Sequence, residues 1–358
     1  MKNLKLMGFL MLFASSLLFI QCTSDPIAGP QGIAGENGND GSDGVDGNTA
    51  CLQCHGQEAG SISSTIDLAN AEYSVSGHAT GVAYLRGTSA GCAECHSQEG
   101  YVQNITGQTV TGTAFPQPIG CKTCHDIHDP EKIEQGSTDF NLRNVAGTTL
   151  KISGILGTDI TIDYGNTSNA CITCHQPRKI SNKDMTKPLL ADLDQDAPYT
   201  LWSHFGPHYG SQATVFEGIQ GEEIGGAIAY PTAGQSPHRT TASCVGCHMG
   251  ETDKGTGGHS WITNKKTCNT CHEDKATTFF DEPMAELTTL LVEQGVLTGE
   301  LNDEGDMEYH LNEIEMTVLQ ARAAWNWEML HVDGSHGVHN PAYTKALLGN
   351  TIDAITVQ

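Results

Sequence analysis

The pattern of apolar residues predicts regular helices mainly toward the end of the chain. A first helix is expected from the start signal Asp281 with Pro283 to the stop signal Gly295. Its apolar stripe consists of Met284, Leu287 and Leu291. Because such a stripe usually faces a protein core, we interpret it as packing surface and not as a cofactor site.

Two more helices are predicted after it. The second has apolar residues at alternating three- and four-residue steps and ends before Gly334. Its stripe consists of Leu311, Ile314, Val318, Ala321 and Trp325. The third is expected from Pro341 to about Ile355, with proline in its first turn. We therefore expect a C-terminal helical segment at about 281–355, in which these helices pack together.

A two-residue period replaces the helical one between Phe140 and Tyr164. Apolar and polar residues alternate in Leu150–Ile152 and again in Ile160–Ile162, on either side of a loop at Gly154–Gly157. This pattern is typical of a β-hairpin. We expect a small hairpin insertion at about 140–165 that has no chemistry of its own.

The N-terminal residues resemble an export signal. Lys2 and Lys5 precede an apolar run from Leu6 to Ile20, which is too short for a membrane-spanning helix. Cys22 stands where a lipoprotein signal peptidase would cut, although Gln21 replaces the usual small residue before it. The prediction is a signal peptide with a lipidation cysteine at 1–22, against the alternative of ordinary cleavage nearby and a free thiol.

Residues 23–50 differ from everything that follows. Glycine recurs every third residue from Gly29 to Thr49, as in collagen, but Pro30 is the one proline in these triplets. A stable triple helix needs more proline, so we interpret the collagen-like run as a flexible acidic tether. Residues 51–358 are expected to form the functional domain.

Charge and composition narrow the possible partners. The chain has 358 residues and a formal net charge of -24, from 18 Lys+Arg and 42 Asp+Glu. Nucleic acid is excluded as a partner because proteins bind it through clustered basic residues. Aromatic residues make up 6% of the chain and glycine contributes 41 residues, which is little material for a conventional core of this size.

Six copies of the motif Cys-x-x-Cys-His dominate the chemistry of the sequence. Two such thiols can each form a thioether to one porphyrin, and the following histidine then reaches the iron, which is the attachment pattern of haem c. The copies are Cys51, Cys54 and His55; Cys92, Cys95 and His96; Cys121, Cys124 and His125; Cys171, Cys174 and His175; Cys244, Cys247 and His248; and Cys268, Cys271 and His272. The cofactor prediction is six haem c groups, with iron as the metal.

Two other uses of these cysteines were considered. Cys244, Cys247, Cys268 and Cys271 come close to a zinc-ribbon spacing, and the thiols of an exported chain can also form disulfides. Neither alternative explains why a histidine follows every pair. The Gly-, Ser- and Thr-rich segments between the motifs indicate irregular coil and short helices around the cofactors.

A six-coordinate iron needs a second ligand opposite the motif histidine. Ten histidines lie outside the motifs: His78, His128, His204, His208, His238, His259, His310, His331, His336 and His339. His128 follows His125 too closely to reach the other face of the same porphyrin, so it is assigned to a neighbouring haem. His78 and His259 lie in small-residue loops that allow close approach to a flat ring. His208 and His238 each follow a proline, which restrains the backbone.

These motifs together resemble extracellular multihaem c-type cytochromes of the outer membrane, here a hexahaem lipoprotein, which are distantly related to cytochrome c554 and pentahaem nitrite reductases. Besides the six motifs, the resemblance rests on His125–His128, Asn169–Arg178 and Asp333–Pro341. It implies a mainly α fold with much irregular coil wrapped around stacked haems, bis-histidine ligation and low reduction potentials. It also implies that His339 is a distal ligand. The predicted distal set is His78, His128, His208, His238, His259 and His339.

Two functions follow from these features. The first is electron transfer along six haems, in extracellular respiration, to partner cytochromes or extracellular acceptors, from a lipid-anchored position on the cell surface. A homo-oligomeric cytochrome filament is a variant of it. The second is an oxidoreductase that acts on nitrite or hydroxylamine at one open haem. Pentahaem nitrite reductases often carry lysine in place of one motif histidine, and all six motifs here end in histidine, which favours the electron carrier.

Overall fold

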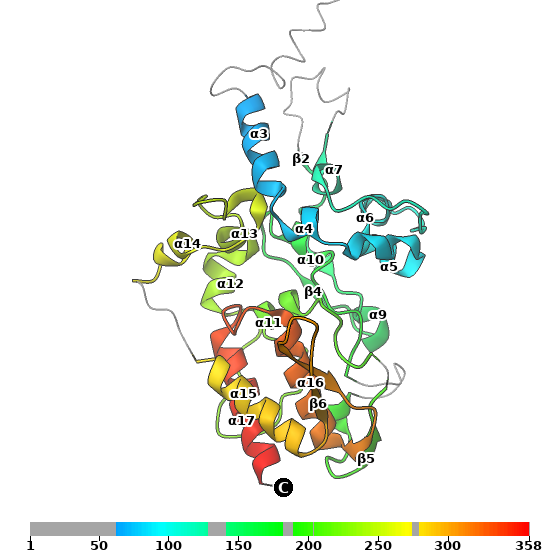
Figure 1. Ribbon diagram of the computed structural model, residues 1–358, viewed down its shortest axis with the longest axis vertical. Helices are drawn as coiled ribbons and strands as arrows, with labels where there is room; N and C mark the ends of the chain where they lie inside the picture. The colour runs from blue at the N-terminus through cyan, green and yellow to red at the C-terminus, as the bar shows by residue number, and fades with distance from the viewer. Residues whose placement is uncertain (1–61, 128–140, 182–188, 203, 274–278, 358) are drawn as a thin grey trace, which may run out of the picture. The chain divides into compact units, whose positions relative to one another are not determined.

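The computed structural model describes residues 62–127, 141–181, 189–202, 204–273 and 279–357 (Figure 1). The predicted signal peptide, Cys22 and the tether lie outside these residues, as do Cys51, Cys54, His55 and His128. The described chain consists of α-helices, irregular segments and two-stranded antiparallel sheets. The prediction of a mainly α fold with much coil, small strand pairs and C-terminal helices is confirmed.

Short helices carry the first part of the described chain. In order, the elements are α3 (Ile62–Tyr73), α4 (Gly77–Thr80), the 3₁₀ helix η2 (Ala83–Thr88), α5 (Ala90–His96), α6 (Gln98–Ile105), α7 (Cys121–Cys124), β1 (His125–Asp126), β2 (Asn141–Leu142), β3 (Thr148–Thr149), α9 (Ser153–Leu156), β4 (Thr161–Ile162) and α10 (Asn169–Ile172). Ser97 caps α6 by accepting a hydrogen bond from the backbone N–H of Gly100, which separates α6 from α5.

The second part begins with short elements and ends with long helices. Its elements are η3 (Leu190–Asp192), β5 (Pro198–Thr200), α11 (Gln212–Glu217), α12 (Pro237–Thr241), α13 (Ser243–His248), η4 (Gly258–Ser260), α14 (Lys265–Asn269), α15 (Asp281–Glu293), β6 (Leu297–Leu301), β7 (Met307–Leu311), β8 (Glu315–Thr317), α16 (Val318–Asp333) and α17 (Pro341–Thr356). The antiparallel strand pairs are β1 with β2, β3 with β4, β5 with β8, and β6 with β7.

The predicted hairpin insertion is present in a shorter form. β3 pairs with β4 in the register Thr148↔Ile162, and the backbone N–H of Leu150 continues the ladder to the Ile160 carbonyl at 2.8 Å. Leu150, Ile152 and Ile162 are buried, so the alternation correctly indicated which side chains face inward. The loop expected at Gly154–Gly157 forms most of the short helix α9, which Gly157 ends in a left-handed conformation.

The first and third predicted C-terminal helices are confirmed as α15 and α17. The second is correct at its end, where Gly334 takes a left-handed φ of 67°, and wrong at its beginning. Thr317 and Gln320 form a capping box that starts α16 at Val318. Leu311 and Ile314, which were assigned to this helix, precede it, and Leu311 ends strand β7.

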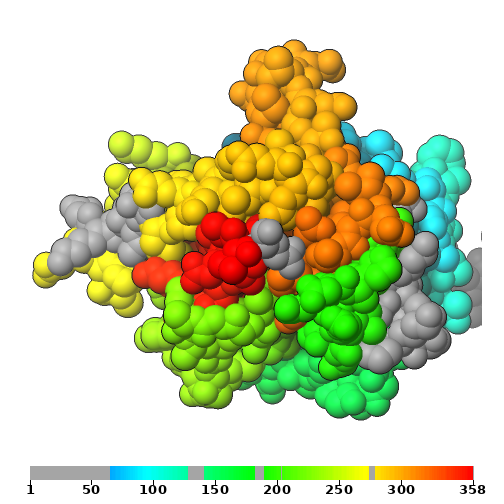
Figure 2. Space-filling view, turned by 90° about the horizontal axis from the view of Figure 1, so that it is seen from below, coloured from blue at the N-terminus to red at the C-terminus, as the bar shows by residue number. Residues whose placement is uncertain are grey.

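Strands β6 and β7 form a hairpin that sequence reasoning missed. Its register runs from Leu297↔Leu311 to Leu301↔Met307, and the hairpin projects at the top of the view in Figure 2. Leu301 and Met307 near its tip are 69% and 53% exposed. At the other end of the hairpin, Leu297 is buried in the core and Leu311 packs against it. Leu311 therefore contacts the core from a strand and not from a helix.

The long helices enclose a conventional apolar core. α15, α16 and α17 lie side by side and bury Leu287, Trp325 and Leu347 (Figure 1). Residues from 190–224, including Phe205, complete this core. The expectation that aromatic residues are too few for a conventional core is therefore wrong for this part of the chain, because the large apolar side chains are concentrated here.

A second, smaller cluster lies near the motifs. It buries Leu150, Ile152, Ile162, Ile172, Ile180 and Ala213. Ile172 stands between the two cysteines of one motif, so this cluster supports that motif directly. Within the described residues, no helix has the length and apolarity that crossing a membrane requires.

Candidate functional site

Five of the six motifs lie within the described residues, each on or beside a short helix. The motifs at 92–96 and 244–248 form the C-terminal ends of α5 and α13. Cys121–Cys124 forms α7, and the motifs at 171–175 and 268–272 begin in α10 and α14 and continue beyond them. In a helical turn, side chains three positions apart lie on the same face, so both thiols of a motif can reach one ligand. None of the ten cysteines of these described motifs is paired in a disulfide.

Each described motif histidine faces a second histidine from a distant part of the chain. The ring-centroid separations are 6.1 Å for His96 with His208, 6.2 Å for His125 with His259, 6.2 Å for His175 with His78, 6.3 Å for His248 with His339, and 6.0 Å for His272 with His238. All five partners belong to the predicted distal set. The pairing itself was not predicted from the sequence.

The separations match two imidazoles that share one metal ion. A metal–imidazole bond is about 2 Å long and the nitrogen lies about 1.1 Å from the ring centre, so two rings on opposite sides of one ion are about 6.3 Å apart. Direct contact of two rings would not select this narrow range of distances. We conclude that each described pair has the spacing of two axial ligands.

The remaining motif histidine and distal candidate, His55 and His128, both lie outside the described residues. Their assignment stays a prediction. His125 and His259 form a pair, which agrees with the argument that His128 does not serve the motif of His125.

Local electrostatics keep two of the distal histidines neutral. Burial, with a smaller contribution from neighbouring His175, lowers the pKa of His78 to about 4. Burial, followed by the charge of Arg178, lowers the pKa of His208 to about 4. Because a metal binds the neutral imidazole, both side chains are ready to act as ligands at neutral pH.

The four histidines left out of the distal set have other surroundings. His331 stacks on Trp327, with ring centroids 5.0 Å apart and planes 9° apart. His336 Nδ1 lies 2.9 Å from the Asp281 carboxylate. His204 and His310 are exposed, the second on strand β7. None of the four faces a motif histidine among the ring contacts of the described residues.

The motif at 171–175 lies at the centre of the described motifs. The Cys174 thiol contacts the Cys95 thiol of one neighbouring motif, and the Cys171 thiol contacts Cys244 of another. A buried hydrogen bond of 2.8 Å between Ser168 and Ser243 joins the beginnings of α10 and α13. The attachment points of these motifs therefore adjoin one another.

Two further motifs extend this arrangement. Tyr101 of α6 lies near Cys124 and Cys174, which brings the 121–125 motif beside the central one. Cys247 lies near Cys268 and Cys271, so the 268–272 motif follows the 244–248 motif. Figure 1 shows the matching succession of α14, α13 and α10. The described motifs thus form a connected and branched array.

Trp261 is a site residue that sequence reasoning missed. Its ring lies 4.8 Å from His78 and 5.8 Å from His259, and its carbonyl oxygen lies 2.8 Å from His248 Nδ1. It therefore contacts ligands of three different pairs. Its φ of 54° is in the left-handed region, which turns the carbonyl toward His248 while the ring faces the other two ligands. Its position two residues after a candidate ligand was the available signal.

Glu72 is a second missed residue. Its buried carboxylate accepts hydrogen bonds from the backbone N–H of His259 at 2.8 Å and from the Thr252 hydroxyl at 2.8 Å. A Cβ added to Gly258 would lie 2.2 Å from Glu72 Oε2. The glycines before His259 were interpreted as room for a flat cofactor, but Gly258 makes room for this carboxylate.

The donor set of each described site fits haem c. Each site offers two thiols for thioether bonds and two imidazoles at the spacing of axial ligands, and these residues are the ones haem c requires. Within the described ranges, no three His, Cys, Asp or Glu side chains converge in the manner of a zinc site. The described motifs therefore offer paired histidines, with two cysteines each, as the residues that would hold haem.

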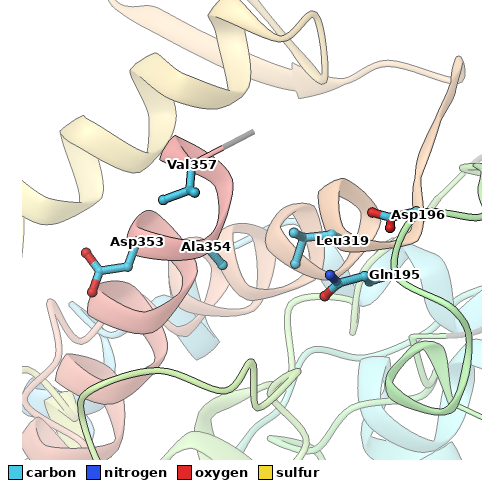
Figure 3. A pocket seen from close by; sticks show the side chains of 6 residues that line it. All are labelled: Gln195, Asp196, Leu319, Asp353, Ala354 and Val357. Atoms are coloured by element: carbon cyan, nitrogen blue, oxygen red, sulfur yellow. The ribbon is translucent and has the colours of Figure 1, made fainter.

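A surface pocket of about 360 Å³ lies apart from the motifs (Figure 3). Gln195, Asp196 and Leu319 line one side of it, and Asp353, Ala354 and Val357 of the last helix and its end line the other. No motif cysteine or paired histidine contributes to it. We assign it no role in the chemistry of the histidine pairs.

No protein-family model and no curated protein matches the sequence. Among solved structures, the chain is similar to the crystal structure of outer cell wall cytochrome OcwA, with 18% sequence identity and a TM-score of 0.46. The match covers 79% of this chain and 49% of that one, so the chain spans about half the length of that cytochrome. A likeness this distant assigns no function to this chain.

Proposed function

We propose that this protein is a multihaem c-type cytochrome that transfers electrons along six haems. The observation that carries the proposal is the second histidine, at 6.0 to 6.3 Å, opposite every described motif histidine. Two axial histidines leave an iron no position for a substrate. Such a site is suited to electron transfer and not to binding a small molecule.

The haem iron, when bound, supplies a one-electron couple between its ferric and ferrous forms. The chain's own residues attach, orient and separate these couples. The cysteines would attach each porphyrin, the paired histidines would hold each iron, and Trp261 packs between histidines of different sites. Ligation by the same two imidazoles in both oxidation states would keep the reorganisation on electron transfer small.

The alternative function is reduction of nitrite or oxidation of hydroxylamine at an open iron. It requires a motif histidine without a partner ligand. Among the motifs that the structure describes, each histidine faces a second histidine, which supports placing such a reaction at Cys51–His55 and nowhere else. His128, the member of the predicted distal set that lies outside the described residues, would then not serve as the partner of that motif.

We further infer an exported, lipid-anchored protein on the cell surface. The support is the sequence: the apolar run Leu6–Ile20, the cysteine at 22 and the Gly-rich tether at 23–50. A net charge of -24 favours basic redox partners, other cytochromes or cationic acceptors over nucleic acid. Membrane extraction followed by mass analysis of the N-terminal peptide should find a lipid on Cys22; an unmodified thiol there contradicts the anchor.

Spin state and haem count test the proposed function together. We expect the intact mass of the purified protein to include six haems, and electron paramagnetic resonance of the oxidised protein to show low-spin iron throughout. A high-spin iron that binds nitrite, hydroxylamine or cyanide would contradict the electron-carrier proposal and direct the assay to an enzyme.

Removing one partner histidine sharpens this test. His208→Ala should convert one of the irons to the high-spin form, open to cyanide, because His96 then has no opposite ligand. His331→Ala is the matched control, since His331 stacks on Trp327 and faces no motif histidine. Identical low-spin spectra for the two variants would refute the assignment of His208.

A further inference from the structure

The turn between α16 and α17 holds one of the paired histidines against a buried carboxylate. His339 Nδ1 lies 2.7 Å from Asp333 Oδ1, and the Asp333 side chain is 1% exposed. The Ser335 hydroxyl donates to Asp333 Oδ2, and the backbone N–H of His339 donates to Ser335 Oγ at 3.2 Å. Both carboxylate oxygens are engaged, so the carboxylate is fixed in its orientation toward the ring.

The charge of this carboxylate acts mainly on the ring of His339. In the described part of the chain, the Asp333 carboxylate forms its ion-pair contact with the imidazole ring of His339. On its other side, His339 faces His248 at 6.3 Å, and Phe216 packs edge-on against the His339 ring at 5.7 Å. Asp333, His339 and His248 thus follow one another through the 244–248 site.

Neighbouring ligands have neutral partners at the same ring position. His238 Nδ1 lies 2.6 Å from the carbonyl oxygen of Val338, the residue just before His339. His248 Nδ1 lies 2.8 Å from the Trp261 carbonyl oxygen. Glu72 approaches His259 Nδ1 only to 3.7 Å and already accepts two other hydrogen bonds. The Asp333 contact is therefore the stronger of the two carboxylate contacts.

We propose that Asp333 is a positioning residue that lowers the reduction potential of the haem held by Cys244, Cys247, His248 and His339. The inference rests on the haem ligation proposed above. A carboxylate that accepts a hydrogen bond from the Nδ1–H group makes the imidazole a stronger electron donor to a metal, as in carboxylate–histidine–metal arrangements. Its negative charge also favours the ferric state, which carries one more positive charge than the ferrous state.

This contact distinguishes two adjacent sites through one turn of chain. Val338 gives the distal ligand of the 268–272 site a neutral acceptor, while Asp333 gives the distal ligand of the 244–248 site an anionic one. With haem bound at both sites, the Asp333 carboxylate would place the midpoint potential of the 244–248 site below the value that a neutral acceptor would give. Reduction there by a one-electron donor, such as a partner cytochrome, would add one electron to the iron without making or breaking a bond.

Spectroelectrochemical titration of Asp333→Asn tests the proposal, with dithionite as reductant and ferricyanide as oxidant. Asparagine keeps the shape and removes the charge. One midpoint potential should rise by roughly 60 mV, which is a tenfold change in the ferric to ferrous ratio at a fixed potential for one electron. His339→Met identifies the component independently, because a methionine ligand raises the potential of the same haem.

Asp281→Asn is the matched control. It removes a carboxylate from His336, a histidine in the same turn that faces no motif histidine. Its redox titration should overlay that of the unmodified protein. An equal shift of potential in both variants would show that the effect comes from the overall charge of the protein, and it would overturn the proposal. Unchanged potentials in Asp333→Asn with all haems present and low-spin would overturn it as well.

If Asp333→Asn does not retain all its haems, a second variant tests the proposal. Ser335→Ala keeps the charge and removes the hydroxyl that orients the carboxylate, so the same component should move in the same direction by a smaller amount. No movement there overturns the proposal. A high-spin or missing haem in the unmodified protein would instead contradict the proposed function, so the two failures are distinguishable.

Discussion

Two regions of this protein are stabilised by different means. The motif region, here residues 62–127, 141–181 and 236–273, holds the described Cys-x-x-Cys-His sequences on helices of four to seven residues. The core module, here 190–202, 204–224 and 279–357, buries Trp325, Trp327 and Tyr343 among three helices of 13 to 16 residues. The motif region holds the described motif histidines and the partner histidines His78, His238 and His259, whereas the core module holds the large apolar cluster and contributes His208 and His339 as partners.

The difference shows where the cofactor must contribute to folding. Helices of four to seven residues are not stable alone, because one or two turns do not repay the cost of nucleation. The small cluster around Ile172 is the main apolar support among the motifs. We infer that covalently attached haem supplies the burial that the motif region lacks, while the core module can fold on its side chains.

The most widespread expected effect follows from removing the central haem. Cys171→Ser with Cys174→Ser prevents attachment at the motif that adjoins those at 92–96 and 244–248. Hydrogen exchange should accelerate by roughly 100-fold or more throughout the motif region, since opening then costs about 3 kcal/mol less. Exchange in α15, α16 and α17 should change little.

The 268–272 motif provides the control for position. Its cysteines are exposed and lie at the edge of the array. Cys268→Ser with Cys271→Ser should accelerate exchange only around α14 and α13. If both double variants have the same effect, or if the helices of the core module lose protection too, the two regions do not differ as argued.

A cavity in the core module should give the opposite result. Trp325 is 1% exposed, packs against Phe205 at 5.4 Å and donates its indole N–H to the Gln220 carbonyl at 2.8 Å. Trp325→Ala should lower the free energy of unfolding of this module by about 3–5 kcal/mol. Denaturant titration followed by circular dichroism measures the loss, and intact mass should show all haems retained.

Leu301→Ala is the control for this variant. Leu301 is 69% exposed near the tip of the β6–β7 hairpin, so its truncation should change stability by less than about 0.5 kcal/mol. Loss of haem from the motifs at 121–125, 171–175 or 268–272 in Trp325→Ala would show that the motif region depends on the same core. The sites at 92–96 and 244–248 are excepted because the core module supplies their partner histidines, His208 and His339.

The parts that sequence predicted are those fixed by local chemistry. Cys-x-x-Cys-His spacing defined the motifs, and cap signals defined α15, α17 and the end of α16. The pairing of His78 with His175, and the contacts of Trp261, depend on segments far apart in the chain. No local pattern encodes them. Composition averaged over the whole chain likewise hid the fact that its large apolar residues are concentrated in one module.

The beginning of α16 shows how two local signals compete. Leu311 and Ile314 fit the helical period, but the capping box at Thr317 and the pairing of β6 with β7 end that period. A hydrogen-bonded cap together with a strand partner outweighs two apolar positions, of which Leu311 is partly buried and Ile314 is exposed. The capping signal is present in the sequence. That it prevails over the helical period depends on the pairing of β6 with β7, which a local pattern does not encode.

The smallest expected effect is a pH dependence at the boundary of the two regions. Burial raises the pKa of Glu328, on α16, to about 7. A Cβ on Gly206 would lie 2.6 Å from the Glu328 side chain, so the segment that leads to His208 covers this carboxyl. Folding favours the protonated form, so stability should fall as the pH rises from about 4.5 to about 7 and then level off, by at most about 3 kcal/mol.

Glu328→Gln should remove this pH dependence, because the amide is neutral throughout and has the same shape. Unfolding measured by circular dichroism at pH 5 and pH 8 should then show a variant that is more stable than the unmodified protein at pH 8 and nearly equal to it at pH 5. Glu286→Gln, at an exposed position on α15, should leave both values unchanged. If Glu328→Gln also shifts haem potentials, the carboxyl acts on the motif region through the Gly206 segment, and the boundary between the two regions is less sharp than their cores indicate.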